Sequence, residues 1–124
     1  MRLLLDSHAV VWWEQGTLGD RARAWLESAE AEVFVSAVTA WELGIKHAQG
    51  RLELGTPLRE IVEVSGFNRL PVTWLHAEAA AALPRHHRDP WDRMLVAQAQ
   101  TEGLSLVTSD RRLARYAVHT VPAR

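Results

Sequence analysis

Acidic residues stand at two points of this sequence where a carboxylate can take part in chemistry. Asp6 directly follows an apolar run at residues 3–5, and Asp110 comes two residues after another at residues 104–108. We expect both runs to be buried strands of a parallel sheet, and the carboxyl ends of such strands line the ligand crevice of an open α/β sheet. Two carboxylates are therefore expected to meet at one edge of the sheet.

Two further acids, Asp92 and Glu42, fall on the apolar side of expected helices. Asp92 shares a helix face with Leu95, Val96 and Ala99, which follow it at helical spacing. That helix is apolar nearly all round, which is typical of a buried helix. Glu42 borders a stripe of apolar residues in an earlier helix. Both acids thus lie where an apolar side chain is expected.

Four acids gathered in this way need a positive charge. Burying an unpaired carboxylate is costly, and converging carboxylates repel one another. A hard divalent cation removes that cost, and Mg²⁺ or Mn²⁺ prefers oxygen ligands. Such a site polarises a phosphate and makes a nucleophile of water, which is the chemistry of phosphodiester hydrolysis. The acids therefore predict a metal-dependent hydrolase.

Each acid also has an ordinary structural interpretation. Asp89 precedes a proline and would be a helix N-cap, and Asp20 would be a first-turn acid. Asp6 and Asp110 could cap the helices that follow them. Glu42 could pair with the lysine four residues later. The joint placement of four acids, rather than any single one, indicates a metal site.

Apolar runs alternate with helical patterns along the chain, and this order predicts βαβ units and a parallel sheet of about five strands. We expect one domain over residues 1–124. The expected strands cover residues 3–5, 33–35, 69–72, 104–108 and 118–121. The expected helices cover residues 8–14, 19–29, 57–65, 76–83 and 90–102, with another running from a Ser36 cap to residue 49, a Thr56 cap before 57–65, and a short helix starting at Asp110.

Composition narrows the class of protein. The chain is 48% hydrophobic and 23% charged, as expected of a globular domain. There is no cysteine, so thiolate metal sites and disulfides are excluded. No stretch approaches the ~20 apolar residues of a membrane span, and the first apolar run is too short for a signal peptide. We expect a cytoplasmic protein without membrane contact.

A formal net charge of −1 gives no bulk attraction to nucleic acid, so RNA binding would rest on local patches. Arginines gather in two segments, which we expect either to form a basic rim that holds RNA phosphates or to be solvated faces. The adjacent pair His86 and His87 cannot face one site, and we expect surface or RNA-contact roles for both. The rim candidates are Arg85, Arg88, Arg93, Arg111, Arg112 and Arg115.

Four segments, in order along the chain, resemble the motifs of PIN-domain proteins of the VapC class. The first resembles the family's opening, and the other three resemble its second, third and fourth acidic motifs. Trp91 stands where many relatives have phenylalanine, which should preserve the aromatic packing. The segments are residues 3–13 (LLLDSHAVVWW), 35–46 (VSAVTAWELGIK), 87–99 (HRDPWDRMLVAQA) and 106–110 (LVTSD).

The resemblance implies a three-layer α/β/α PIN-like fold and one or two Mg²⁺ ions, with Mn²⁺ as the alternative. It implies Asp6 and Asp92 as direct ligands, with Glu42 and Asp110 completing the acidic and catalytic set. Ser7 and Thr108 match positions where a hydroxyl supports the carboxylates, and Asp89 would lie near the site in a supporting role. Under this hypothesis the ion acts on the scissile phosphate and the attacking water, and no protein nucleophile is needed.

The resemblance also implies partners and a biological role. Relatives mostly cleave RNA, many are toxins of toxin–antitoxin pairs, and dimers are usual. We therefore expect an endoribonuclease toxin that is inhibited by a cognate VapB-like antitoxin and forms a homodimer.

The sequence argues against two other classes of protein and leaves a third open. A phosphoryl-acceptor receiver domain needs a lysine after a late strand, and the only lysine is Lys46, within a helix pattern. A haloacid-dehalogenase-type phosphatase needs a second aspartate two residues after the first, where this chain has His8. A non-enzymatic interaction module stays open, and Mg²⁺-dependent RNA cleavage would separate it from the nuclease.

Overall fold

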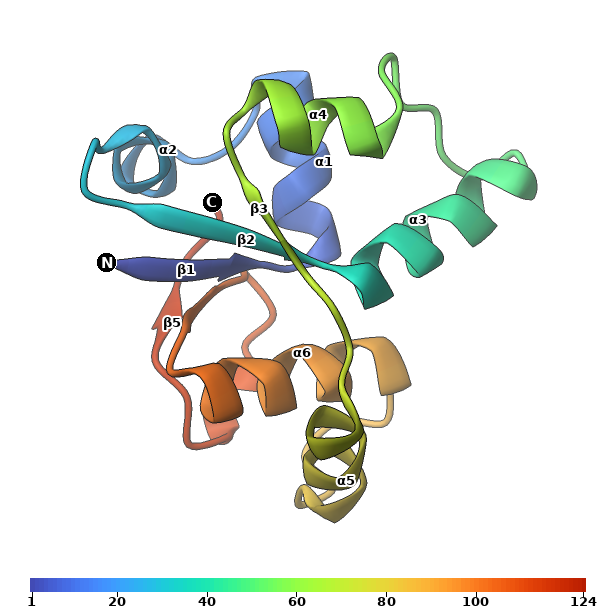
Figure 1. Ribbon diagram of the computed structural model, residues 1–124, viewed down its shortest axis with the longest axis vertical. Helices are drawn as coiled ribbons and strands as arrows, with labels where there is room; N and C mark the ends of the chain where they lie inside the picture. Colours follow the sequence, from blue (N-terminus) through green and yellow to red (C-terminus); the bar gives the residue numbers. More distant parts are fainter.

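A five-stranded parallel sheet forms the centre of the protein (Figure 1). The computed structural model describes all residues from 1 to 124. The strands lie in the order β3-β2-β1-β4-β5, and every neighbouring pair is parallel. This confirms the expected parallel sheet. The strands are β1 (Arg2–Leu5), β2 (Glu32–Ser36), β3 (Asn68–Leu70), β4 (Ser105–Val107) and β5 (Thr120–Val121).

Six α-helices occupy the places where helical patterns were expected, with shifted ends. The helix expected from residue 76 begins earlier because Thr73 caps it, in a capping box with His76. The cap expected at Thr56 is wrong, since the N-cap position is Pro57 without a side-chain hydrogen bond. The helices are α1 (Ser7–Gln15), α2 (Asp20–Glu27), α3 (Ala37–Ala48), α4 (Leu58–Val64), α5 (Trp74–Ala82) and α6 (Pro90–Glu102), and a 3₁₀ turn covers Leu113–Arg115.

None of these helices combines the length and apolar character needed to cross a membrane.

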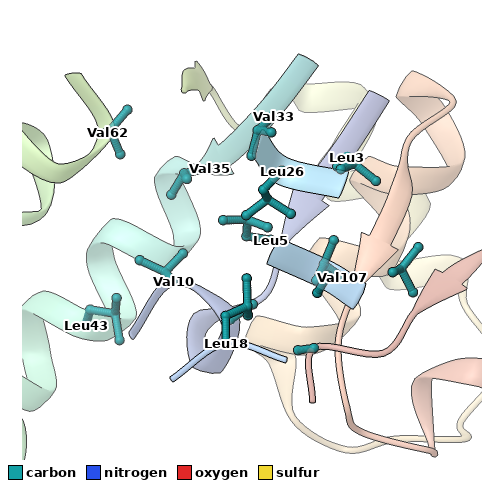
Figure 2. Packing of buried hydrophobic residues seen from close by; sticks show 14 residues of the cluster. Leu3, Leu5, Val10, Leu18, Leu26, Val33, Val35, Leu43, Val62 and Val107 are labelled. Atoms are coloured by element: carbon teal, nitrogen blue, oxygen red, sulfur yellow. The ribbon is translucent and has the colours of Figure 1, made fainter. Parts of the chain in front are cut away.

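Helices cover both faces of the sheet, which makes the predicted three layers. Leu3, Leu4 and Leu5 of β1 are fully buried because alternate side chains enter opposite cores. Leu3 and Leu5 pack with residues of α1, α2, α3 and α4, including Val10 and Leu26 (Figure 2). Leu4 packs on the other face, mainly with α6. In Figure 1, α5 lies outside α6, on the face opposite to α1 and α2.

Two strands pass into helices without an intervening loop, and this fixes what stands at the edge of the sheet. β1 ends one residue before the N-cap Asp6 of α1, and Ser36, the last residue of β2, caps α3 through its hydroxyl. The Asp6 N–H donates to Val107 O at 3.1 Å and so prolongs the pairing of β1 with β4. Since α3 packs against both α1 and α6, the beginnings of these helices meet at the carboxyl edge of the sheet.

The chain end is packed against the loop before α2, and a pair of glycine substitutions tests this. A Cβ at Gly19 would lie 2.9 Å from Arg124 Cα, whereas a Cβ at Gly44, inside α3, meets nothing within 4 Å. We expect Gly19→Ala to lower the free energy of unfolding by about 1–3 kcal/mol through overpacking. Gly44→Ala should raise it by about 0.5–1 kcal/mol because alanine favours a helix. Urea denaturation of both variants measures the two effects, and shifts of the same sign would contradict this packing.

Candidate metal centre

Three of the four predicted acids lie where α1, α3 and α6 meet the sheet, and the fourth, Asp110, offers a ligand atom within 4.8 Å of Asp92. Asp6 caps α1 and is 4% exposed, and Glu42 lies on α3 and is 8% exposed. Asp92 lies in the first turn of α6 with 21% of its side chain exposed. The charges of Asp6 and Glu42 both act on Asp92, and that of Glu42 acts on Asp6. Segments more than 30 residues apart in the sequence thus bring their carboxylates together.

Asp6 is both the N-cap of α1 and a member of this cluster, so its structural role as a cap and its place among the acids are compatible. Its Oδ1 accepts the Ala9 N–H at 2.8 Å. Burial raises the pKa of Asp6, and the Thr108 hydroxyl and the Ala9 N–H only partly offset this. The Thr108 hydroxyl is therefore a hydrogen-bonding partner of an acid of the cluster.

Asp92 has the least compensated charge of the cluster. Burial, followed by the charge of Asp89, raises the pKa of Asp92 to about 7, and the charges of Asp6 and Glu42 add to the shift. His87 works in the opposite direction. His87 is the only basic group paired with the Asp92 carboxylate, and its Nε2 lies 3.1 Å from Oδ2. Oδ1 has no protein donor.

Glu42 is held on both oxygens. Ser7 Oγ donates to Oε1, and Lys46 Nζ lies 3.0 Å from Oε2. The predicted pair with Lys46 therefore forms, and Ser7 supplies the hydroxyl expected from the motif. Since Ser7 follows Asp6 directly, this hydrogen bond ties α3 to the first turn of α1.

Asp110 lies beyond β4, and basic groups surround its carboxylate. Arg112 donates to Oδ1 from its backbone N–H at 3.0 Å and from Nε at 3.1 Å, and to Oδ2 from Nη2 at 3.0 Å. His87 Nε2 lies 3.0 Å from Oδ2. Partial burial acts to raise the pKa of Asp110, but the hydrogen bonds from Arg112 and His87 outweigh it and lower this pKa to about 2. Asp110 is thus an ionised, paired carboxylate.

His87 is the site residue that the sequence interpretation missed, and the expected surface role is wrong for it. It is 7% exposed, and Nε2 lies between Asp92 Oδ2 and Asp110 Oδ2. Nδ1 accepts the Asp89 N–H at 3.1 Å, so Nε2 carries the proton. His86 instead packs edge-on against Tyr116. The adjacent histidines do face different ways, but one of them faces the acids.

A signal for His87 exists in the sequence. It stands two residues before the N-cap of α6, and that helix begins at the acid cluster. A residue at this point must pass close to the start of α6 and hence to Asp92. When His86 and His87 are considered only as an adjacent pair, the position of His87 beside the start of α6 is easily overlooked.

Arg93 braces the loop that carries His87, and its expected place on a free basic rim is wrong. The Tyr116 hydroxyl donates to Pro84 O at 2.9 Å and accepts the His87 N–H at 3.0 Å. The terminal nitrogens of Arg93 donate to the carbonyls of Ala80, Leu83 and Pro84, at 3.0 Å each. Arg93 therefore helps to hold this loop in place, and its guanidinium is not free for RNA.

The other candidate arginines divide into free and paired groups. Arg85, Arg88, Arg111 and Arg115 are exposed and make no ion pair. Arg112 is paired with Asp110, which differs from its expected place on a free rim. A hollow of about 510 Å³ joins both groups beside the acids. It is lined by Arg85, His86, His87, Arg88, Asp89 and Arg112.

Asp89 and Asp20 take the structural positions that their sequence context favours. Asp89 caps α6 by accepting the Trp91 N–H at 2.9 Å. It also acts on the site, since its charge is the second cause of the raised pKa of Asp92, after burial. Trp91 packs edge-on against Trp41 at 4.5 Å between ring centroids, so tryptophan supplies aromatic packing at this position. Asp20 is a first-turn acid of α2.

The donor set fits a hard divalent cation. Its members are carboxylate oxygens, which Mg²⁺ and Mn²⁺ prefer, with one imidazole nearby. Ligand atoms of His87, Asp92 and Asp110 lie within 4.8 Å of one another. Burial raises the pKa of both Asp6 and Asp92, so the site disfavours their charged forms when no cation is bound. A cation beside Asp6 and Asp92 would supply the missing charge.

A separate apolar groove of about 870 Å³ lies between α3, α4 and the β3 edge of the sheet. Its walls include Val35, Leu43, Leu58, Val62 and Leu70. None of the four acids lines it. The groove is therefore a second surface feature, independent of the acid cluster.

Known proteins resemble this chain in sequence and in fold. The model of the PIN domain matches residues 3–119. Ribonuclease VapC22 of Mycobacterium tuberculosis is 36% identical over 118 residues, which cover 90% of this chain and 88% of that protein.

Solved structures share the fold at low sequence identity. A chain of VapBC2 from Rickettsia felis, bound to a DNA fragment from their promoter, superposes with a TM-score of 0.73 at 13% identity over 98% of both chains. FitAcB from Neisseria gonorrhoeae gives a TM-score of 0.71 at 20% identity, over 98% of this chain and 97% of that chain. By the family match over most of its length and by its similarity to VapC22, this chain belongs to the PIN domain family.

Proposed function

We propose that this protein is a divalent-metal-dependent endoribonuclease and the toxin of a toxin–antitoxin pair. The observation that carries the proposal is the convergence of Asp6, Glu42 and Asp92 at a largely buried site where two carboxylates have raised pKa values. Its relative VapC22 is named a ribonuclease, which supports RNA as the substrate.

The acids divide the work of holding an ion. Asp6 and Asp92 are the direct ligands, because neither carboxylate is neutralised by a bound arginine or lysine. Glu42, fixed by Ser7 and Lys46, adds negative charge from the α3 side. A bound Mg²⁺, or Mn²⁺ in its place, would supply a Lewis acid for the scissile phosphate and the attacking water. The protein itself supplies orientation and charge, and no side chain acts as nucleophile.

Exposed arginines beside the acids position the RNA strand. Arg85, Arg88 and Arg111 have no carboxylate partner, so their charge is available for phosphates. Contacts to phosphates fix the position of a strand without reading its sequence. RNA would lie across this rim with one phosphate over the acid cluster.

The apolar groove would take the antitoxin. Related structures are described as VapBC and toxin–antitoxin complexes, including one from Klebsiella pneumoniae. An amphipathic segment could lay its apolar face between Leu43 of α3 and Leu58 and Val62 of α4. Since the groove excludes the four acids, the antitoxin would be anchored away from the ion. The homodimer stays a prediction.

Removing one ligand tests the metal-dependent cleavage. Asp92→Asn keeps the shape of the side chain but removes its charge, and we expect RNA cleavage with Mg²⁺ to fall at least ~100-fold. Cleavage by the wild type should stop with EDTA and return with excess Mg²⁺. The assay is the rate of cleavage of a labelled RNA, with thermal melting to check that the variant folds.

Asp20→Asn is the matched control, because it removes the same charge from an exposed helix start and should leave cleavage unchanged. A folded Asp92→Asn protein that cuts RNA at the wild-type rate would refute the proposed ligand. A wild type that cuts no RNA with Mg²⁺ would favour the interaction module instead.

Stability of the metal-free protein should fall as pH rises. In the folded chain the pKa of Asp92 is about 7, against 3.8 for an ordinary aspartate, and burial raises the pKa of Asp6 as well. Folding therefore takes up protons between these values, and the resulting stabilisation is lost as pH rises toward about 7. Between about pH 5 and pH 8 in EDTA, the melting temperature of wild type should drop by roughly 3 °C more than that of Asp92→Asn.

Excess Mg²⁺ should reverse this trend. The ion competes with the proton on Asp92, so its stabilising effect should be larger at the higher pH. Thermal melts with and without Mg²⁺ measure this difference. Parallel curves for wild type and Asp92→Asn would show that Asp92 does not hold a proton that the ion displaces.

A charged side chain in the groove separates antitoxin binding from cleavage. Ala40 lines the groove and is exposed, so Ala40→Arg should fold and cleave RNA while losing affinity for the antitoxin. We expect at least ~10-fold weaker inhibition, since a charge would have to be buried under the partner. Titration of cleavage with the product of the adjacent antitoxin gene measures this. Ala77→Arg on α5 is the control, and equal inhibition of both variants would place the antitoxin elsewhere.

A further inference from the structure

We propose that Asp110 is a positioning residue that holds Arg112 in a subsite for an RNA phosphate, and that it is not a direct metal ligand. This inference rests on the proposed nuclease function and concerns the substrate side of the same site. It changes the role that the family resemblance implied for Asp110.

The oxygens of Asp110 already have protein donors. Arg112 donates three hydrogen bonds to the carboxylate, and His87 donates a fourth. By contrast, Asp92 has a single partner on one oxygen. Ligand atoms of His87, Asp92 and Asp110 lie within 4.8 Å of one another, but an ion that bound Asp110 there would have to displace charge-assisted hydrogen bonds, whereas Asp92 offers a free oxygen. The preferred metal position is therefore on the Asp6–Asp92 side of the cluster.

The pairing fixes the direction of the Arg112 guanidinium. Asp110 binds Arg112 side-on, through Nε and Nη2, and this leaves Nη1 without a protein partner. Arginine loses much rotamer freedom when it binds a ligand, and a carboxylate that holds it in place beforehand reduces that loss. Asp110 thus prepares a donor on an otherwise exposed side chain.

His87, which lies next to the acids, is held by contacts of its own. Its Nδ1 accepts the Asp89 N–H, and its own backbone N–H donates to the Tyr116 hydroxyl. The loop around it is held by the hydrogen bonds from Arg93 to backbone carbonyls. The Nε2–H of His87 therefore points at the acids without further rearrangement.

The hollow beside Asp110 has the chemistry of a phosphate site. Arg85, Arg88 and Arg112 line it together with His86 and His87, and Asp89 is its only acid. Its volume of about 510 Å³ has room for a nucleotide phosphate and part of its sugar. Because His87 contacts Asp92 and also lines the hollow, the hollow adjoins the metal site. A strand with one phosphate at the ion would place a neighbouring phosphate here.

For the affinity of Asp110→Asn for RNA, the expected change has the opposite sign to the one that net charge alone predicts. RNA is a polyanion, so removal of a negative charge should tighten its binding. If Asp110 instead holds Arg112 in place, Asp110→Asn should weaken binding. A direct metal ligand would have no such effect when no metal is present.

The experiment measures RNA binding and metal binding separately. A fluorescent single-stranded RNA is titrated in EDTA, where it stays intact, and we expect Asp110→Asn and Arg112→Ala each to weaken binding about tenfold. The double variant should be no weaker than Arg112→Ala alone, because Asp110 acts through Arg112. Arg112→Lys keeps the charge but not the side-on pairing, and it should also weaken binding. The slope of log affinity against log salt should fall by about 0.7 in Arg112→Ala, the value for one phosphate on a single strand.

Metal affinity is measured on the same proteins by calorimetric titration with Mn²⁺. Asp110→Asn should bind within about threefold of wild type, whereas Asp92→Asn should bind at least about tenfold more weakly. Arg21→Ala, at an exposed site on α2, is the control for loss of one positive charge. Thermal melts check folding, and the surface variants of Arg112 test the subsite even if Asp110→Asn folds poorly.

Two results would overturn the proposal. One is RNA binding by Asp110→Asn that equals or exceeds that of the wild type. The other is a loss of Mn²⁺ affinity in Asp110→Asn as large as that in Asp92→Asn. Failure of the proposed function looks different, since the wild type itself would then neither bind RNA in EDTA nor cleave it with Mg²⁺.

Discussion

The burial of carboxylates is the constraint on which this site depends, and their mutual repulsion adds to it. Asp6, Glu42 and Asp92 are brought together with only partial compensation by protein groups, and burial raises the pKa of both aspartates. A cluster of this kind opposes folding, so it persists only because the rest of the chain imposes it. The three fully buried leucines of β1 supply much of that rigidity, since they enter both cores and lead directly into Asp6. A cation at the site would offset the cost of burying these charges.

The protein meets this constraint differently on the two sides of the cluster. On one side Glu42 is paired with Lys46, and on the other Asp110 is paired with Arg112 and His87. Between them, Asp92 is paired only with His87, whose Nε2 lies 3.1 Å from Oδ2. Positive charge is thus placed around the cluster and withheld from its centre. This arrangement leaves the central oxygens open to an ion, and under the proposed function the exposed basic groups beside the cluster would face a polyanionic substrate.

Much of this could be predicted from the sequence, because the strongest signals are local. The order of apolar runs and helices was enough to predict the parallel sheet. The position of Asp6 directly after β1 was enough to place this acid at the carboxyl edge of the sheet. Asp92 could be placed because an acid on an otherwise apolar helix has few explanations. The roles of His87 and Arg93 could not be predicted in this way. They come from contacts that the loop following α5 makes with α6 and with Tyr116. Periodicity carries no information on such contacts, and charge alone made Arg93 look like a free surface residue.

We expect a divalent ion to neutralise the negative charge of Asp6 and Asp92 in place of protons. Isothermal titration of the protein with Mg²⁺ at about pH 6, repeated in buffers of different ionisation enthalpy, measures the protons released as the ion binds. Since the pKa of Asp92 is about 7, this carboxyl is mostly protonated at that pH, and binding should release about one proton. The release should fall sharply in Asp92→Asn. Absence of Mg²⁺ binding, or binding without proton release, would contradict the account.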